Sequence, residues 1–411
     1  MRCATLKTVL LTICCVANAQ NPPLSNDELI KSAVAQLVAM QEEDGAWPYE
    51  GVYRVGGQIP IGYRVGGTAI VGQSLLYAAP TDDQAANRAL QRGVEFILSQ
   101  LDDPLLKPST KDAYDVRVWG HCYVLEFFCR LRAADRCGTH RQQIEAWIPR
   151  LVEALITQEL KEGGWNYASR KQHASFVTAP VVQSLLIARA QGEKVPDDVF
   201  DRARKTLNAA RYDDGAFLYS GVRPGRHPAT QSADAKARDA AKDIAAASQP
   251  SGADKPAAPT TAPVTTRPAR RTELPGSIAR SAVAESTLMM LGAQSQPQIR
   301  GAIDAFHTHW NELEKRRRKT GTHEGPYGIA PYYFYYGHRY AAQAIQMLPE
   351  TERAAEAARL REVILRTRDE DGTWNDRVFP RSRNFGSAMC VMALLGDRVP
   401  LPPNLDGVRN R

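Results

Sequence analysis

The sequence has no apolar run that approaches the roughly 20 residues a membrane-spanning helix needs. It also lacks a strong charge of one sign, because 52 lysines and arginines stand against 45 acidic residues and the excess is spread along the chain. Neither a polytopic membrane protein nor a nucleic-acid-binding protein is therefore predicted. With 43% hydrophobic residues over 411 positions, the composition is that of a folded globular chain.

Residues 1–19 are typical of a signal peptide. Two basic residues, Arg2 and Lys7, flank the start of a short apolar stretch at 9–16, and an A-x-A cleavage signal follows at 17–19. We therefore expect a mature chain of residues 20–411, exported to the periplasm or the cell exterior and without a transmembrane segment.

Cysteines are few, and no C-x-x-C occurs among the seven. A cysteine-based zinc site or redox centre is therefore not predicted. Three of the seven leave with the expected signal peptide, and the remaining four are Cys122, Cys129, Cys137 and Cys390. An even number permits disulfides in an oxidising compartment, and buried free thiols are the alternative that the sequence leaves open.

The chain repeats itself. TAIVGQSLL at 68–76 returns as TAPVVQSLL at 178–186, and GHCY at 120–123 returns as GHRY at 337–340. Six such segments share one register position, which we call the mark; it is occupied by Thr68, His121, Thr178, Ser281, His338 and Ser387. The marks are about 50–57 residues apart, except for one gap of twice that length. This gap contains residues 226–276, whose richness in Ala, Pro, Thr and Ser predicts a disordered insertion.

Each marked segment is apolar nearly all round and follows an amphipathic stretch of helical period. The amphipathic stretches are 27–40, 84–101, 141–160, 197–210, 298–315 and 350–367. Six helical hairpins are predicted, with the first helix outside and the second buried. Neither terminal hairpin is more polar than the rest, as the caps of an open solenoid would be. The pattern therefore favours an all-α closed ring, an α/α toroid with an inner and an outer barrel of helices.

The turns within the hairpins share an acidic-Gly-x-aromatic pattern. Examples are QEEDGAW at 41–47, EGGW at 162–165 and DEDGTW at 369–374. With Gln41, Gly45 and Trp47, the first turn resembles the Q-x-x-x-G-x-W motif of the terpenoid cyclase/protein prenyltransferase α/α-toroid superfamily, which includes squalene-hopene-cyclase-like and prenyltransferase/squalene oxidase repeat proteins. The resemblance covers roughly residues 28–396 and implies the toroid fold, because the motif is structural.

The catalytic motifs of that superfamily are missing. Its cyclases use an acidic D-x-D-D sequence, and its thioester proteins need C-G-E-Q; neither occurs here. Its prenyltransferases hold zinc with Asp, Cys and His, but Gly120 stands where a ligand precedes Cys122, and His121 is one residue out of register. No metal and no cofactor are therefore predicted.

Other residues at and near the marks are candidates for a site. In a closed ring, His121 and His338 would face each other across the cavity mouth as acid or base, with Asp115 nearby. One turn before a mark stand three arginines suited to an anionic ligand, Arg64, Arg117 and Arg383, and an aromatic run contributes Tyr336. The alternative is structural: the hydroxyl residues cap the inner helices and the arginines pair with acids of neighbouring repeats.

Two function classes stay open. The first is an exported toroid that binds an unidentified ligand, a small molecule or an envelope polymer, in its central cavity without the family's catalysis; the arginines fit an anionic ligand. The second is an enzyme, either terpenoid-cyclase-like or acting on an anionic polymer, that uses the His and Arg residues at the rim.

Overall fold

The computed structural model describes residues 24–108, 115–167, 172–221, 273–321, 323 and 325–409. The expected signal peptide lies outside these ranges, as does the expected disordered insertion except for its last four residues. Of these four residues, Leu274–Gly276 forms a short 3-10 helix, η3, that leads into the next inner helix. Throughout the described ranges the regular structure is helical, with isolated β-bridges but no strand.

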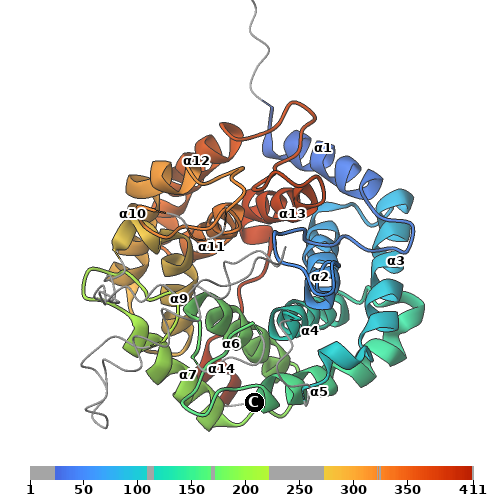
Figure 1. Cartoon of the computed structure of the whole chain (residues 1–411), viewed down its shortest axis with the longest axis horizontal. Coiled ribbons are helices and arrows are strands. Elements are labelled where there is room, and N and C mark those ends of the chain that lie inside the picture. Colours follow the sequence, from blue (N-terminus) through green and yellow to red (C-terminus); the bar gives the residue numbers. More distant parts are fainter. Residues whose placement is uncertain are drawn as a thin grey trace, which may run out of the picture.

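Six helices form a closed inner ring (Figure 1). They are α2 (Ile61–Ala78), α4 (Arg117–Ala133), α6 (Ser175–Ala190), α9 (Ile278–Met290), α11 (Tyr333–Gln346) and α13 (Ser382–Leu395). Each packs against the next in chain order, and α13 packs back against α2. Almost every residue of these helices is buried, as their lack of a polar face predicts.

The outer ring surrounds this barrel (Figure 1). It consists of α1 (Asn26–Ala39), α3 (Gln84–Gln100), α5 (Arg141–Thr157), α7 (Asp197–Ala210), α10 (Gln296–Glu314) and α12 (Glu350–Leu365). Each buries one stripe; in α7 the stripe is Val199, Phe200, Ala203 and Leu207. The predicted α/α toroid is confirmed, and no described helix is long and apolar enough to cross a membrane.

The turn aromatics join the two rings. Trp47, Trp165 and Trp374 are fully buried, and each indole N–H donates to a carbonyl of the preceding outer helix, at Leu37 (2.7 Å), Leu155 (2.7 Å) and Ile364 (2.9 Å). Their backbone N–H groups donate to the marks Thr68 (2.9 Å), Thr178 (2.9 Å) and Ser387 (3.1 Å). These hydroxyls therefore hold the turns in place and do not cap the inner helices, because each lies inside its helix, beyond the N-cap residues Pro60, Ala174 and Arg381.

The remaining elements are short. Beyond the two rings lie η1 (Pro104–Leu106), η2 (Gly138–His140), η4 (Gly396–Arg398) and α14 (Leu405–Arg409). The four cysteines of the expected mature chain are free and buried, so the second of the two alternatives left by the sequence holds.

Candidate functional site

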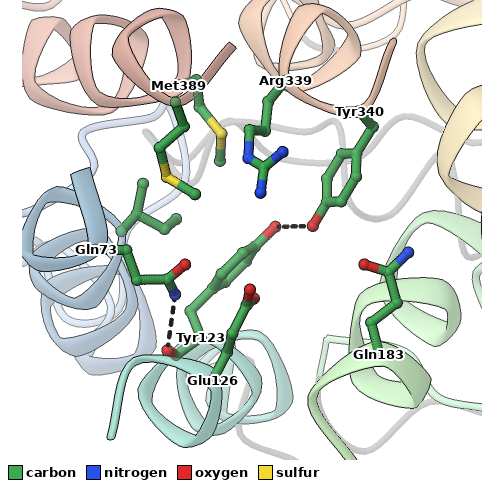
Figure 2. Close-up of a pocket in the computed structure, with 9 residues that line it drawn as sticks. Gln73, Tyr123, Glu126, Gln183, Arg339, Tyr340 and Met389 are labelled. Carbon is green, nitrogen blue, oxygen red and sulfur yellow. Dashed lines mark hydrogen bonds between the residues drawn. The ribbon is translucent and has the colours of Figure 1, made fainter. Parts of the chain in front are cut away.

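A small cavity lies on the axis of the inner barrel (Figure 2). Five of the six inner helices supply its lining: Ile70, Gln73, Tyr123, Glu126, Gln183, Arg339, Tyr340, Met389 and Met392. The unobstructed space between these side chains has room for about one water molecule. The cavity is thus suited to a small ion or to the end of a ligand, and not to a bulky one.

The repeat explains why polar groups reach this cavity. Gln73, Glu126 and Gln183 each stand five residues after a mark, so they project at one level of the ring. Gln343 has the same place on α11, and its amide exchanges two hydrogen bonds of 3.0 Å with that of Gln183. The amide of Gln73 donates to the Tyr123 carbonyl at 3.4 Å. Most of these amides are thereby satisfied within the protein, as buried polar groups are in general.

Arg339 is the exception. Its guanidinium points into the cavity from α11 (Figure 2), and only 4% of the residue is exposed. Nη1 has no hydrogen-bond partner among the residues that the structure describes. Burial lowers the pKa of this guanidinium. Because arginine remains protonated in proteins even so, an unpaired positive charge faces the cavity.

The carboxylate in the cavity wall is already paired. Glu126 accepts from Nε of Arg130 at 2.8 Å, and Nη2 of Arg130 lies 2.7 Å from the same oxygen. Arg130 also donates to the Tyr77 hydroxyl at 3.2 Å and to the Pro400 carbonyl at 3.1 Å. Two guanidinium groups therefore stand against one carboxylate, which leaves the cavity with a net positive charge.

Two tyrosines, Tyr123 and Tyr340, complete the cavity wall (Figure 2). The hydroxyls of Tyr123 and Tyr340 are 3.3 Å apart, and burial raises the pKa of both phenols, so both stay protonated. One of the two hydroxyls donates to the other, and the second keeps its proton for another acceptor. Tyr336, a predicted ligand-binding residue, packs on Tyr340 with ring centroids 4.6 Å apart, but its hydroxyl donates to the Phe176 carbonyl at 2.8 Å. Tyr336 thus lies behind the cavity wall.

The predicted rim of free arginines does not form. Arg64 pairs with Asp44, Arg117 pairs with Asp115 at 2.7 Å, and Arg383 pairs with Asp371 at 2.9 Å. Asp44 and Asp371 are the acids of the turn motif, which the fold brings beside the arginine one turn before the mark. The Arg117–Asp115 pair is buried at the start of α4 and also holds the Lys107 carbonyl. These arginines therefore tie turns to helices, and none of the three guanidinium groups is free of a carboxylate.

The two histidines face outward, away from the cavity. His121 is 3% exposed and accepts at Nδ1 from Gln158, at the end of the outer helix α5, at 3.1 Å. His338 is fully buried against Trp310 of α10 and two phenylalanines. Burial lowers the pKa of His121 to about 4 and that of His338 to about 3, so both are neutral at pH 7. The mark faces the outer ring, which separates these histidines from each other and from the axis.

One buried acidic residue, Asp376, was not predicted as a site residue from the sequence. Asp376 is fully buried, and burial raises the pKa of its carboxyl group to about 7. The Tyr49 hydroxyl lies 3.5 Å from Oδ2, and Oδ1 has no partner within the described ranges. One signal was available: Asp376 stands two residues after a turn aromatic, where other repeats have Tyr49, Tyr167 and Tyr219.

A resident metal has no evident place. In the part of the chain that the structure describes, no three His, Cys, Asp or Glu side chains are grouped so that they could hold a metal ion.

Comparisons with known proteins bear on the fold. No family model and no curated protein matches the sequence. Among solved structures, a variant of type II terpene cyclase MstE from Scytonema, in complex with geranylgeranyl dihydroxybenzoate, matches with a TM-score of 0.50 and 13% identity over 91% of this chain and 98% of that one. An inactive variant of the α-1,6-mannanase GH76A of Salegentibacter, in complex with α-1,6-mannotriose, matches with a TM-score of 0.53 and 13% identity over 90% and 100%. The chain therefore shares the α/α-toroid fold of these two proteins.

Proposed function

We propose that this toroid is a binding protein that holds a small anion, or the anionic end of a larger ligand, in its central cavity. The unpaired guanidinium of Arg339 carries the proposal. Glu126, the carboxylate of the cavity wall, is shared with its ion-pair partner Arg130, so one positive charge stays in excess. A buried excess charge destabilises the folded state, and an anion that enters the cavity would remove this cost.

The rest of the cavity supports the same ligand class. A phenolic O–H of the Tyr123–Tyr340 pair is available as a second donor beside the guanidinium. Charge-assisted hydrogen bonds of this kind are about twice as strong as those between neutral groups. Sulfur and alkyl groups of Met389, Met392 and Ile70 line the remaining wall, and they keep the site dry and the electrostatic interaction strong.

Thermal unfolding in different sodium salts tests the proposal. Fluoride and chloride are small enough for the cavity, whereas gluconate at the same ionic strength is not. We expect the small anions to raise the Tm of the wild type, because a ligand that binds only the folded state stabilises it, by about 2.7 kcal/mol at 100 times its Kd. In Arg339→Met, which removes the charge and keeps the length of the side chain, the difference between salts should vanish.

Arg359→Met is the matched control, because Arg359 is an exposed arginine paired with Glu356 on the outer helix α12. It should keep the full difference between the small anions and gluconate. Equal Tm values in all three salts for the wild type, or the same difference in Arg339→Met as in the wild type, would contradict the proposal.

A second candidate function is an enzyme that uses acid catalysis, and Asp376 is the observation that favours it. A carboxyl group with a pKa near 7 can donate a proton at neutral pH, whereas the neutral His and paired Arg residues of the expected rim are poorly placed to do so. Incubation with geranylgeranyl dihydroxybenzoate and with α-1,6-mannotriose, followed by mass spectrometry, tests it. If the wild type forms a product and Asp376→Asn does not, the protein is an enzyme that uses this acid. If neither compound gives a product, these two substrate classes lose their support.

A further inference from the structure

The C-terminal segment crosses one end of the inner barrel. In the ring order α2, α4, α6, α9, α11, α13, the helices α13 and α6 stand opposite each other. The chain leaves α13 at Leu395, and α14 packs against α6. Residues 396–409, which we call the strap, must therefore pass over the C-terminal end of the ring, and Figure 1 shows this red segment running across the middle of the ring.

The strap has contacts along its whole length. At its start, Val399 is buried and Arg398 pairs with Asp27 at 3.0 Å. Near its start, the Gln346 amide donates to the Gly396 carbonyl at 2.6 Å. At its middle, Arg130 donates to the Pro400 carbonyl at 3.1 Å, and the same arginine pairs with Glu126 in the cavity wall. The strap is thus one arginine side chain away from the cavity. Its last part, α14, which we call the tip, buries Leu405 and Val408.

Ion pairs hold the outer side of the tip. Arg409 lies 3.3 Å from Asp197 and 3.8 Å from Asp201, both on α7. All three side chains are at least one-third exposed. Pairs of this kind are weak and are screened by salt. The tip therefore depends on two apolar side chains and a salt-sensitive contact.

The opposite end of the barrel is closed much more firmly. Aromatic rings there belong to the inner helices or to the turns that the marks hold, and they pack on one another. Tyr63 and Trp119 have ring centroids 5.2 Å apart, Tyr49 and Phe385 are 4.6 Å apart, and the hydroxyls of Tyr167 and Tyr332 are 2.8 Å apart. Opening this end would disrupt the core itself.

We propose that the strap is a releasable cover and that small solutes enter the central cavity by its local detachment from α6 and α7. Segments with few buried apolar contacts open at a small fraction of the free energy of global unfolding. The inference rests on the proposed function only for the charge of the solute; the cover and its release are properties of the fold.

Thiol labelling tests the strap directly. Met392 lines the cavity, so Met392→Cys places a thiol there, and the native Cys137, buried in the turn after α4, serves as the internal reference. Methyl methanethiosulfonate is the probe, and peptide mass mapping gives the rate at each site. Three chains in the Met392→Cys background are compared: one unchanged, one with Arg409→Glu, which repels Asp197 and Asp201, and one that ends at Arg398. Arg359→Glu, which disrupts an exposed ion pair on α12, is the matched control.

We expect labelling at position 392 to be about tenfold faster or more in Arg409→Glu and in the shortened chain, and faster in high salt for the unchanged chain. The rate at Cys137 should not change, and Arg359→Glu should behave as the unchanged chain. Equal rates at position 392 in all chains would overturn the inference. So would an equal acceleration at position 392 and at Cys137, because it would indicate global unfolding.

A charged pair of reagents separates this inference from the proposed function. In the shortened chain, a sulfonate-bearing methanethiosulfonate should label position 392 faster than a trimethylammonium-bearing one, and Arg339→Met should abolish the preference. If the strap opens but the two reagents label position 392 at equal rates, the releasable strap is established and the anion site is contradicted. If the strap does not open, the releasable strap is contradicted, and the Tm of the intact protein in different salts still tests the anion site.

Discussion

The indole of Trp310 donates its N–H to Nε2 of His338 at 2.9 Å, and Nδ1 of the same imidazole lies 2.7 Å from the Phe334 carbonyl. Since an indole N–H can only donate, Nε2 must accept, and the imidazole proton resides on Nδ1. Both ring nitrogens are thereby satisfied in the neutral form. The repeated G-H-x-Y sequence predicted a catalytic role for His338. Its side chain instead joins an inner helix to the outer ring.

This arrangement predicts acid sensitivity. Burial lowers the pKa of His338 to about 3, and those of His121 and His173 to about 4, against 6.5 in the unfolded chain. The stability that these groups contribute is present above pH 6.5 and is lost as the pH falls toward 4, because the unfolded chain binds the protons first. The loss is about 1.4 kcal/mol per pH unit for each histidine.

Urea unfolding between pH 4.5 and pH 7.5 provides the measurement. The free energy of unfolding should fall less steeply in His338→Gln than in the wild type below pH 6.5, by about 1.4 kcal/mol per pH unit. Parallel curves for the two proteins would show that folding does not lower the pKa of this histidine.

The raised pKa of Asp376 predicts that its contribution to the free energy of unfolding has a pH dependence of the opposite sign. Its carboxyl group keeps its proton up to about pH 7 in the folded protein and ionises near pH 3.8 in the unfolded chain. Stability from this group is therefore present at low pH and is lost as the pH rises through 7. Relative to the wild type, Asp376→Asn should gain about 1.4 kcal/mol per pH unit between pH 5 and pH 7 and then level off. Guanidinium chloride midpoints at pH 5, 6, 7 and 8 measure this difference, which a constant offset between the two proteins would contradict.

The buried pair Arg117–Asp115 should contribute to stability and not to ligand binding. Arg117→Met leaves a buried carboxylate unpaired and should cost about 3–5 kcal/mol of unfolding free energy. Combining it with Asp115→Asn should recover part of the loss, since no isolated charge then remains. Chemical denaturation of the single and double variants checks this, and a single variant with wild-type stability but weakened anion binding would restore the sequence-based role of Arg117.

The turn aromatics should be among the most sensitive positions of the fold. Trp165→Ala removes a fully buried indole and should cost about 3–5 kcal/mol. Thr178→Val removes the hydroxyl that accepts the Trp165 backbone N–H and should cost about 1–3 kcal/mol. Thr308→Val, at an exposed position of α10, is the control and should change the urea midpoint little. Equal midpoints for Thr178→Val and Thr308→Val would show that the mark does not hold the turn.

Part of the site could have been predicted from the sequence. The five-residue offset from the marks to Gln73, Glu126 and Gln183 is visible in the repeat, and these residues do line the cavity. Arg339 directly follows the mark on α11, but the other repeats have Ala or Cys at this position. Comparison of the repeats therefore could not predict a positively charged group in the cavity. Asp376 could not be predicted either, because it stands at a position where three other repeats have tyrosine.

The sequence by itself determined the helices, their pairing into hairpins and the toroid, because helical period and the turn motif are local signals that recur in each repeat. Tertiary structure alone decided which side of each inner helix faces the axis. Those helices are apolar all round, so they have no polar face from which the direction could be read. For the same reason, only the folded chain shows that Asp44 reaches Arg64, that His338 faces the outer ring, and that the strap spans from α13 to α6.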